Sequence, residues 1–251
     1  MSPAAPSPVS EDALLDGRVR LLQPVEGYRV AIDPVLLAAA VPARPGESVL
    51  DIGCGVGAAA LCLAMRVAEV RIAGFDSDAA LVRLANENIR LNGLAERVQA
   101  MTGDLLHPPP RLEPGSFAHV MANPPFLPAD RVTAPDHAGK KSARLEGAAD
   151  LAAWVRFALA MLRAKGSFTL IHRADRLDAV LAQLAGRAGD ILVFPLWPGL
   201  GKPAKRVIVR ARKGVASPLR LEAGLVLHEP DGGFTAAAEA VLRGGAGLAL
   251  D

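Results

Sequence analysis

The sequence predicts a single α/β domain with a doubly wound, mainly parallel sheet, and three observations support this fold class. From residue 48 onward, short apolar stretches typical of buried strands alternate with amphipathic stretches typical of helices. The chain has 251 residues, of which 51% are hydrophobic, so it is long enough to bury a large core. Its formal net charge is only +2, which excludes both a disordered polyelectrolyte and a protein that coats nucleic acid by bulk charge.

The N-terminal part is expected to hold a tail and a hairpin. Residues 1–10 contain three prolines and neither Lys nor Arg, which indicates a flexible tail and not a signal or transit peptide. The dipeptide Asp16-Gly17 stands between the apolar stretches Ala13–Leu15 and Val19–Leu22, and this pattern predicts the turn of a β-hairpin.

A helix is expected after the hairpin. Asp33 can cap free amides, Pro34 suits the first helical position, and the apolar stretch Val35–Val41 continues until Pro42.

Strands and helices then alternate through the rest of the chain. Seven strands are expected at Ser48–Ile52, Val70–Phe75, Arg97–Met101, Phe117–Met121, Phe168–Ile171, Ile191–Phe194 and Arg206–Val209. Helices are expected at Ala58–Val67, Asp78–Leu91, Leu151–Arg163 and Leu177–Leu184, with a further strand at Leu225–Leu227 and a short helix at Ala236–Leu242.

No repeat or linker divides the chain, so we expect one domain over residues 11–251. It comprises a lead-in of hairpin and helix (11–47), a core that carries the chemistry (48–215) and a C-terminal extension (216–251). A polar, proline-containing stretch from Leu127 to Gly147 is about twenty residues long, and a loop of that length is more typical of a functional lid than of a plain connection.

A glycine loop follows the first strand of the core. Asp51 is followed by Gly53, Gly55 and Gly57, and a helix is expected to begin directly after them. Glycines let the backbone approach a ligand closely, and a helix N-terminus offers free amides. The spacing G-x-G-x-G differs from the G-x-G-x-x-G of dinucleotide-binding loops.

With its preceding acid, this loop resembles the first motif of methyltransferases that use S-adenosylmethionine (SAM), in which the acid and the loop hold the methionine end of the cofactor. Asp76 ends the second strand, where a carboxylate can accept hydrogen bonds from ribose hydroxyls, although it could instead cap the next helix. Asp104 follows the third strand, where the family places a contact to the adenine amino group; otherwise it is a turn aspartate. The three acids are expected at one edge of the sheet.

The motif Asn123-Pro124-Pro125-Phe126 directly follows the fourth strand. An amino group conjugated to a ring is a weak nucleophile, and two acceptors aimed at its protons help it to attack a methyl sulfonium. The carboxamide oxygen of Asn123 and the carbonyl of Pro124 can be those acceptors, because the prolines fix the turn. Phe126 can stack on a flat acceptor. The other interpretation is an ordinary Asn-Pro turn.

This motif resembles the N-P-P-[FY] signature of amino-group methyltransferases, which act on adenine in tRNA, guanine in rRNA or glutamine in release factors. Four further segments resemble the tRNA (valine) adenine-N6 methyltransferase family: GYRVAIDPVLL (27–37), LIHR (170–173), KPAKRV (202–207) and HEPDG (228–232). The resemblance implies a Rossmann-like class I methyltransferase fold with a seven-stranded, mainly parallel sheet. It also implies methyl transfer to the N6 amine of an adenosine beside a tRNA anticodon.

In that family the lead-in packs over the cofactor, so the resemblance makes Tyr28, Arg29 and Asp33 candidates for cofactor binding. The sequence departs from the family at one place. Relatives carry an Asp five residues before the signature Asn, and here that position is Ala118, followed by His119. The missing acid lies at the start of the strand, so we expect it to affect packing more than chemistry.

Two basic segments are candidates for RNA contact. The expected lid loop contains Lys140, Lys141 and Arg144, and the segment 202–213 contains six cations and no acid, beginning with Lys202, Lys205 and Arg206. The alternative for the second segment is a solvated strand face.

The two cysteines, Cys54 and Cys62, are too few for a cysteine zinc site or a disulfide framework. No metal is expected, and no apolar stretch reaches the length of a membrane span. These features indicate a protein of the reducing cytoplasm.

Three alternatives stay open. The same mechanism could act on N2 of a guanine in rRNA or on N5 of a protein glutamine. The chain could also be a non-catalytic RNA-binding relative that retains SAM. A small-molecule O-methyltransferase is less consistent with the sequence, since no candidate metal site or general base is evident near the acceptor motif.

Overall fold

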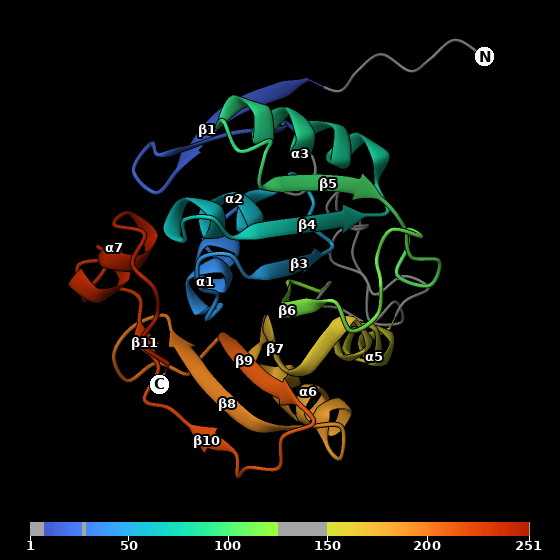
Figure 1. Ribbon diagram of the computed structural model, residues 1–251. Coiled ribbons are helices and arrows are strands. Elements are labelled where there is room, and N and C mark those ends of the chain that lie inside the picture. The colour runs from blue at the N-terminus through green and yellow to red at the C-terminus, as the bar shows by residue number, and fades with distance from the viewer. Residues whose placement is uncertain (1–7, 27–28, 125–149, 251) are drawn as a thin grey trace.

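A single large sheet forms the centre of the computed structural model, which describes residues 8–26, 29–124 and 150–250 (Figure 1). Its nine strands have the order β10-β8-β9-β7-β6-β3-β4-β5, and β11 also pairs with β8. The longer strands are β3 (Ser48–Ile52), β4 (Arg71–Asp76), β5 (Val98–Thr102), β6 (Phe117–Ala122), β7 (Leu162–Arg173), β8 (Ala188–Trp197) and β9 (Arg206–Lys213). The remaining two, β10 (Arg220–Leu221) and β11 (Leu225–Val226), have two residues each.

Strand direction identifies where a ligand can enter. β3, β4, β5, β6 and β7 are parallel to their neighbours in this set, whereas β9 is antiparallel to both β7 and β8. From β3 the chain adds β4 and β5 on one side and then β6 and β7 on the other. The strand order therefore reverses between β3 and β6, and in open α/β sheets ligands bind at the carboxyl ends of the strands at such a point.

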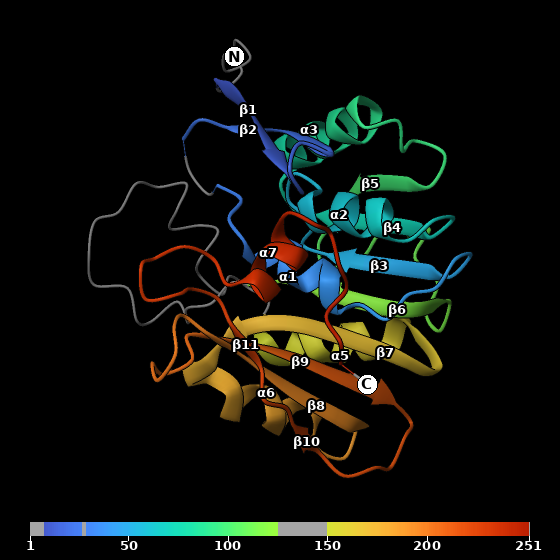
Figure 2. The same cartoon turned by 90° about the vertical axis from the view of Figure 1, so that its left-hand side faces the viewer.

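Helices cover both faces of the sheet, as Figures 1 and 2 show. One core contains residues of α1 (Asp33–Ala40), α2 (Ala58–Arg66), α3 (Ala79–Leu91) and α7 (Ala236–Leu242). The other contains residues of α5 (Leu151–Met161) and α6 (Leu177–Leu184), which follows the short 3-10 helix η2 (Ala174–Arg176). Alternation along the strands separates the two cores, because Val49 belongs to the first and Leu50 to the second.

The predicted N-terminal hairpin is confirmed. β1 (Val9–Leu14) pairs with β2 (Val19–Pro24) in antiparallel register, with Glu11 opposite Leu22. The hairpin lies beside α3 and not in the main sheet (Figure 1). β1 begins at Val9, so the strand includes two residues of the segment 1–10 that the sequence assigned to a tail.

The doubly wound fold class is also confirmed, and the seven predicted strands correspond to the seven longer ones. The structure adds the two-residue strand β10, which the sequence analysis did not predict because so short a strand leaves no periodic pattern. β7 starts at Leu162, six residues before the predicted strand and directly after α5 ends at Met161. Leu162 pairs with Phe117 of β6, and the register shifts before Ser167 pairs with His119.

The prediction that Asp33 caps α1 is wrong. The N-cap residue is Ile32, whose apolar side chain makes no hydrogen bond to the first turn of this helix. The Asp33 carboxylate instead accepts a hydrogen bond from Arg206 Nε at 3.1 Å, so it joins α1 to the start of β9.

The C-terminal segment returns to the first helix (Figure 2). The Leu248 amide donates to the Ala39 carbonyl at 2.8 Å, and Arg210 Nη2 donates to the Leu250 carbonyl at 2.7 Å. Leu250 itself is only 2% exposed. Within the described ranges, none of the helices is both long enough and apolar enough to span a bilayer.

Candidate functional site

The structure places the glycine loop and the Asn-Pro motif side by side at the point where the strand order reverses. Ile52, the last residue of β3, is paired with Ala122, the last residue of β6. Gly53 and Asn123 therefore leave adjacent strands at the same level. The Asp51 and Asn123 side chains belong to the edge at which ligands of such sheets bind.

Backbone hydrogen bonds fix the shape of the glycine loop. The amides of Gly53 and Cys54 both donate to the Phe75 carbonyl, at 2.9 and 3.0 Å. The Gly55 amide donates to Asp76 Oδ2 at 2.9 Å. The end of β4 therefore holds the loop through these three hydrogen bonds.

Two of the glycines are required for different reasons. Gly53 has a φ of +67° and lies under a ring, since a Cβ there would stand 2.7 Å from Trp154 Cη2. Gly55 has a φ of +54°, and apart from its chain neighbours no atom of the described residues would lie within 4 Å of a Cβ there. The space above Gly55 is open to a ligand, whereas the space above Gly53 belongs to the Trp154 ring.

Asp51 is a buried acid without a sufficient partner. It is 2% exposed, and its Oδ2 atom has no hydrogen-bond partner among the described residues. Burial, and secondarily the negative charge of Asp76, raise the pKa of Asp51 to about 8, despite a hydrogen bond from the Ala60 amide. A cationic ligand beside it would favour the ionised carboxylate.

Asp76 ends β4 and holds backbone amides. Its carboxylate accepts from Gly55 N and from Asp78 N, both at 2.9 Å, and burial raises its pKa. Asp76 is not the cap of the next helix. Asp78 takes that role, because its Oδ1 accepts from the amides of Ala80 and Leu81.

Asp104 is the acid of the three for which the structure shows only a local role. Its Oδ1 accepts from Leu106 N at 3.0 Å, its Oδ2 lies 3.4 Å from His107 Nδ1, and its side chain is 51% exposed. The bond from the Leu106 amide is the main reason that its pKa is lowered. It lies two residues beyond Thr102, which is paired with Asp76 at the same edge of the sheet.

Asn123, like Asp51, has a buried side-chain oxygen without a hydrogen-bond partner among the described residues, and it lies where the methyl acceptor is expected. Its Oδ1 atom is buried, and no donor in the described part of the chain reaches it. The next residue, Pro124, is buried and cannot donate a backbone hydrogen bond. A buried acceptor without a donor is costly, which is typical of a site that a ligand completes. Phe126 lies outside the described residues, as does Tyr28.

These groups fit the predicted cofactor. SAM carries an ammonium and a sulfonium cation, ribose hydroxyl donors and an adenine amine. The structure offers the buried Asp51 and the partly buried Asp76, an unpartnered carboxylate oxygen and, among the described residues, open space over Gly55. Asp51 and Asp76 could hold donors of the cofactor, and the loop backbone could pack against it. In the described ranges no group of three or more His, Cys, Asp and Glu residues could hold a metal ion.

The basic segment 202–213 divides into two parts. Lys202 and Lys205 are exposed in the turn between β8 and β9, at the same edge as the site. Arg206 is paired with Asp33, and Arg210 bonds to the Leu250 carbonyl. The two last cations lie at the opposite edge, where Arg212 Nε donates to the Lys165 carbonyl and Lys213 Nζ to that of Leu162.

Lys202 and Lys205 are therefore the exposed cations of this segment that lie at the edge of the sheet with the candidate site. The lid candidates Lys140, Lys141 and Arg144 lie outside the described residues.

The sequence analysis missed two residues that shape the loop. Trp154 follows the Asp150 cap of α5 and packs against Gly53. Asn88, on α3, is fully buried and donates from Nδ2 to the Val56 carbonyl of the loop at 3.0 Å. An Asn on the apolar face of an amphipathic helix was the available signal for the second.

His172, also fully buried, has its pKa lowered to about 4 mainly by burial, so it is neutral.

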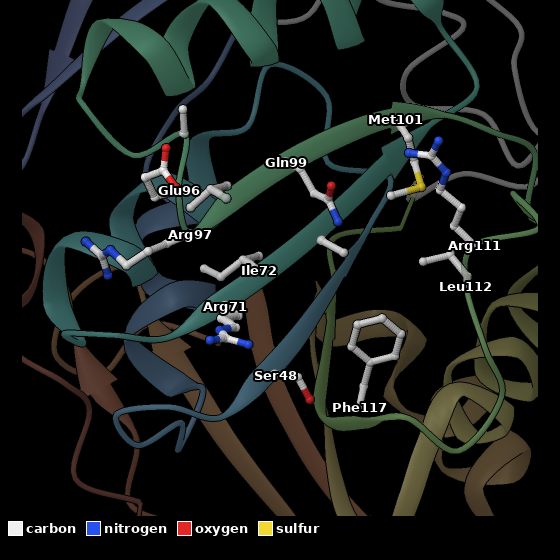
Figure 3. A pocket seen from close by; sticks show the side chains of 13 residues that line it. Ser48, Arg71, Ile72, Glu96, Arg97, Gln99, Met101, Arg111, Leu112 and Phe117 are labelled. Carbon is white, nitrogen blue, oxygen red and sulfur yellow. The ribbon is translucent and has the colours of Figure 1, made fainter.

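A separate cavity of about 320 Å³ lies on the outer part of the sheet, over β4 and β5 (Figure 3). It is lined by residues such as Arg71, Gln99, Arg111 and Phe117. None of the predicted cofactor or acceptor residues in the described ranges lines it, so it is distinct from the part of the candidate site that the structure describes.

The sequence matches the family described as Methyltransferase small domain over residues 29–175. A tRNA1(Val) (adenine(37)-N6)-methyltransferase from Yersinia pestis (strain Pestoides F) is 32% identical over 189 residues, which are 72% of this chain and 73% of that relative.

Two solved structures share the fold. A predicted O-methyltransferase from Agrobacterium tumefaciens has a TM-score of 0.71 at 24% identity, over 86% of this chain and 98% of that one. Geranyl diphosphate C-methyltransferase from Streptomyces coelicolor A3(2), solved with S-adenosyl-L-homocysteine, has a TM-score of 0.53 at 13% identity and covers 72% of this chain and 74% of that one.

Proposed function

The chain belongs to the Methyltransferase small domain family and is a SAM-dependent methyltransferase, and from this premise we propose that it methylates the exocyclic N6 amine of an adenosine in the anticodon region of a tRNA. Its compartment would be the cytoplasm, where tRNA is modified. The observation that carries the choice of an amine is the buried Asn123 oxygen, for which the described residues offer no donor. An amine proton is a donor of the required kind.

The residues have separate tasks in this reaction. When bound, SAM supplies an electrophilic methyl group on a sulfonium. Asp51 and Asp76 hold donors of the cofactor, and Gly55 leaves room for it. Asn123 and the Pro124 carbonyl accept hydrogen bonds from the two amine protons and so direct the nitrogen lone pair toward the methyl carbon. Alignment and electrostatics would then lower the barrier. No general base is required before attack, because the methylated nitrogen loses its surplus proton to water once its bond to the methyl group has replaced the sulfonium's bond.

A tRNA substrate is supported by two observations. The relative from Yersinia pestis bears the name of a tRNA adenine-N6 methyltransferase. Lys202 and Lys205 are exposed at the edge of the sheet that carries Asn123, where they can contact phosphates. We therefore favour adenosine over the two acceptors that would use the same mechanism, N2 of guanine in rRNA and N5 of glutamine in a protein.

The substrate is tested with radiolabelled SAM. The protein is incubated in parallel with total tRNA, ribosomal RNA and a release factor, and the products are digested to nucleosides or amino acids. We expect label in N6-methyladenosine from tRNA. Label in N2-methylguanosine or in methylglutamine alone would contradict the assignment. Loss of N6-methyladenosine from the tRNA of cells without this protein would identify the acceptor in vivo.

The role of Asn123 is tested by Asn123→Ala. Without the side-chain acceptor, kcat should fall about 100-fold or more, while the Kd for SAM stays within a few-fold of the wild-type value. The control is Asn86→Ala, which removes an amide of α3 that bonds to the Val82 and Ala100 carbonyls and lies away from the acceptor motif. Unchanged turnover in Asn123→Ala would remove the basis of the proposal.

A further inference from the structure

Asn88 occupies an unusual place for an amide. It belongs to the buried face of α3, is 0% exposed, and shares that face with Val82, Ala85 and Ile89. Asn is a poor helix former, and burial of an unpaired amide is costly. A residue of this kind is expected to make specific hydrogen bonds that an apolar side chain could not provide.

The Asn88 side chain bonds to two separate parts of the chain. Its Oδ1 accepts from the Leu22 amide at 2.7 Å, and its Nδ2 donates to the Leu22 carbonyl at 2.9 Å. The same Nδ2 donates to the Val56 carbonyl at 3.0 Å. Both N–H groups of the amide are used, so one side chain joins the hairpin strand β2 to the glycine loop.

A second amide makes the hairpin bonds without the loop bond. Asn92 Oδ1 accepts from the Arg20 amide at 2.9 Å, and Asn92 Nδ2 donates to the Arg20 carbonyl at 2.7 Å. Two residues along a strand span about 6.8 Å and four along a helix about 6 Å, so two Asn residues four apart match alternate residues of β2. The remaining bond of Asn92 goes to the Asn88 carbonyl in its own helix.

The hydrogen bond from Asn88 to the Val56 carbonyl reaches the part of the glycine loop that borders the expected cofactor space. Val56 stands between Gly55, which faces open space, and Gly57, whose missing Cβ would lie 3.5 Å from Ala85 Cβ. α3 therefore touches this side of the loop at two points, through packing at Ala85 and through the hydrogen bond of Asn88. On the other side the end of β4 holds Gly55 through Asp76.

We propose that Asn88 is a positioning residue that couples the N-terminal hairpin to the glycine loop and thereby sets the affinity for SAM. The hairpin, which lies along α3 (Figure 1), is then a support of the cofactor site and not a separate appendage. The inference rests on the SAM dependence of the enzyme and is independent of the acceptor.

The test compares Asn88→Ala with Asn92→Ala in the full chain. S-adenosylhomocysteine binding is measured by calorimetry without RNA, so an incorrect acceptor assignment would not affect the result. Both variants lose two hairpin bonds and should lower the melting temperature. Only Asn88→Ala should raise the Kd, by about tenfold, which corresponds to one hydrogen bond and its unpaired partner. The KM for SAM should rise in parallel, with kcat at saturating SAM nearly unchanged.

Equal Kd values in the two variants, or an unchanged Kd in Asn88→Ala, would overturn the proposal, because a merely structural role changes stability without this difference. A measurement on the wild-type protein covers the case in which Asn88→Ala does not fold. S-adenosylhomocysteine should slow amide hydrogen exchange at Leu22 more than at Arg20, since coupling is reciprocal. No slowing at Leu22 would also contradict the coupling.

Discussion

At the scale of the residue, Asp51 places an ionisable group in an apolar setting directly beside the cofactor space. Its pKa of about 8 means that it holds a proton at neutral pH while the site is empty. Because SAM is cationic, binding favours the carboxylate and releases this proton. The Kd for SAM should therefore decrease between about pH 6 and pH 8, and this change should be absent in Asp51→Asn. Calorimetric titration in buffers of different ionisation enthalpy measures both the Kd and the released proton.

The same shift affects stability. The unfolded chain ionises Asp51 near its ordinary pKa, whereas the folded chain keeps the proton up to about pH 8. The contribution of this residue to the free energy of unfolding is therefore full below about pH 4 and is lost as the pH rises through 8. Asp51→Asn should melt several degrees above the wild type at about pH 8 in the absence of ligand. A lower melting temperature of the variant at that pH would contradict this account.

Alanine substitutions at Gly53 and Gly55 should affect different properties, protein stability at Gly53 and SAM binding at Gly55. Gly53→Ala brings a Cβ to 2.7 Å from the Trp154 ring and should cost about 1–3 kcal/mol of stability. Gly55→Ala meets no atom of the described residues within 4 Å apart from its chain neighbours, so beyond the strain of its positive φ its main effect should be a raised Kd for SAM. Melting curves and S-adenosylhomocysteine titrations of both variants give the comparison. A larger stability loss in Gly55→Ala together with a larger rise in Kd in Gly53→Ala would contradict this prediction.

At the scale of the element, the stability of α3 depends on its N-cap residue, Asp78. Asp78 accepts from the amides of Ala80 and Leu81, so Asp78→Ala should cost about 1 kcal/mol, or about 2–4 °C in melting temperature. Asp78→Ser keeps a capping oxygen and removes a charge that adds to the effect of burial in raising the pKa of Asp76. It should stay near the wild-type stability. Equal losses in the two variants would mean that the charge, and not the cap, stabilises the helix.

Elements with strong local signals were predictable from the sequence. β3 and α6 have the predicted bounds because glycines and polar residues punctuate their apolar stretches. β7 was predicted too short, since the exposed residues Arg163, Ala164 and Lys165 give its first half no apolar pattern. The role of Asp33 was also missed, because its partner Arg206 is 173 residues away and no local rule reports such a pair.

At the scale of the whole molecule, the cations around the turn between β8 and β9 are expected to have two roles. Lys202 and Lys205 should serve tRNA binding, whereas Arg206 should serve protein stability. Lys202→Gln with Lys205→Gln should weaken tRNA binding and reduce its salt dependence without a change in melting temperature. Arg206→Gln should instead lower the melting temperature, because it breaks the half-buried pair with Asp33. Filter binding at several salt concentrations and thermal melts test both parts, and a destabilised lysine double variant would contradict the division.

The candidate site was predictable in outline for a topological reason. Parallel strands bring their carboxyl ends to one edge, so Asp51, Asp76 and Asn123 could be placed together before their contacts were known. The contacts themselves were not predictable. That Asp76 bonds to the Gly55 amide, and that Trp154 occupies the space over Gly53, depend on packing between elements far apart in the sequence.

The anchored C-terminal segment has a practical consequence for anyone who labels or immobilises this enzyme. Leu250 is almost fully covered and receives a hydrogen bond from Arg210, while Leu248 is bonded to α1. A fluorescent reporter attached close behind Leu250 would strain the contacts that hold this segment against α1 and β9. A spacer of several residues between Leu250 and the reporter should avoid this strain.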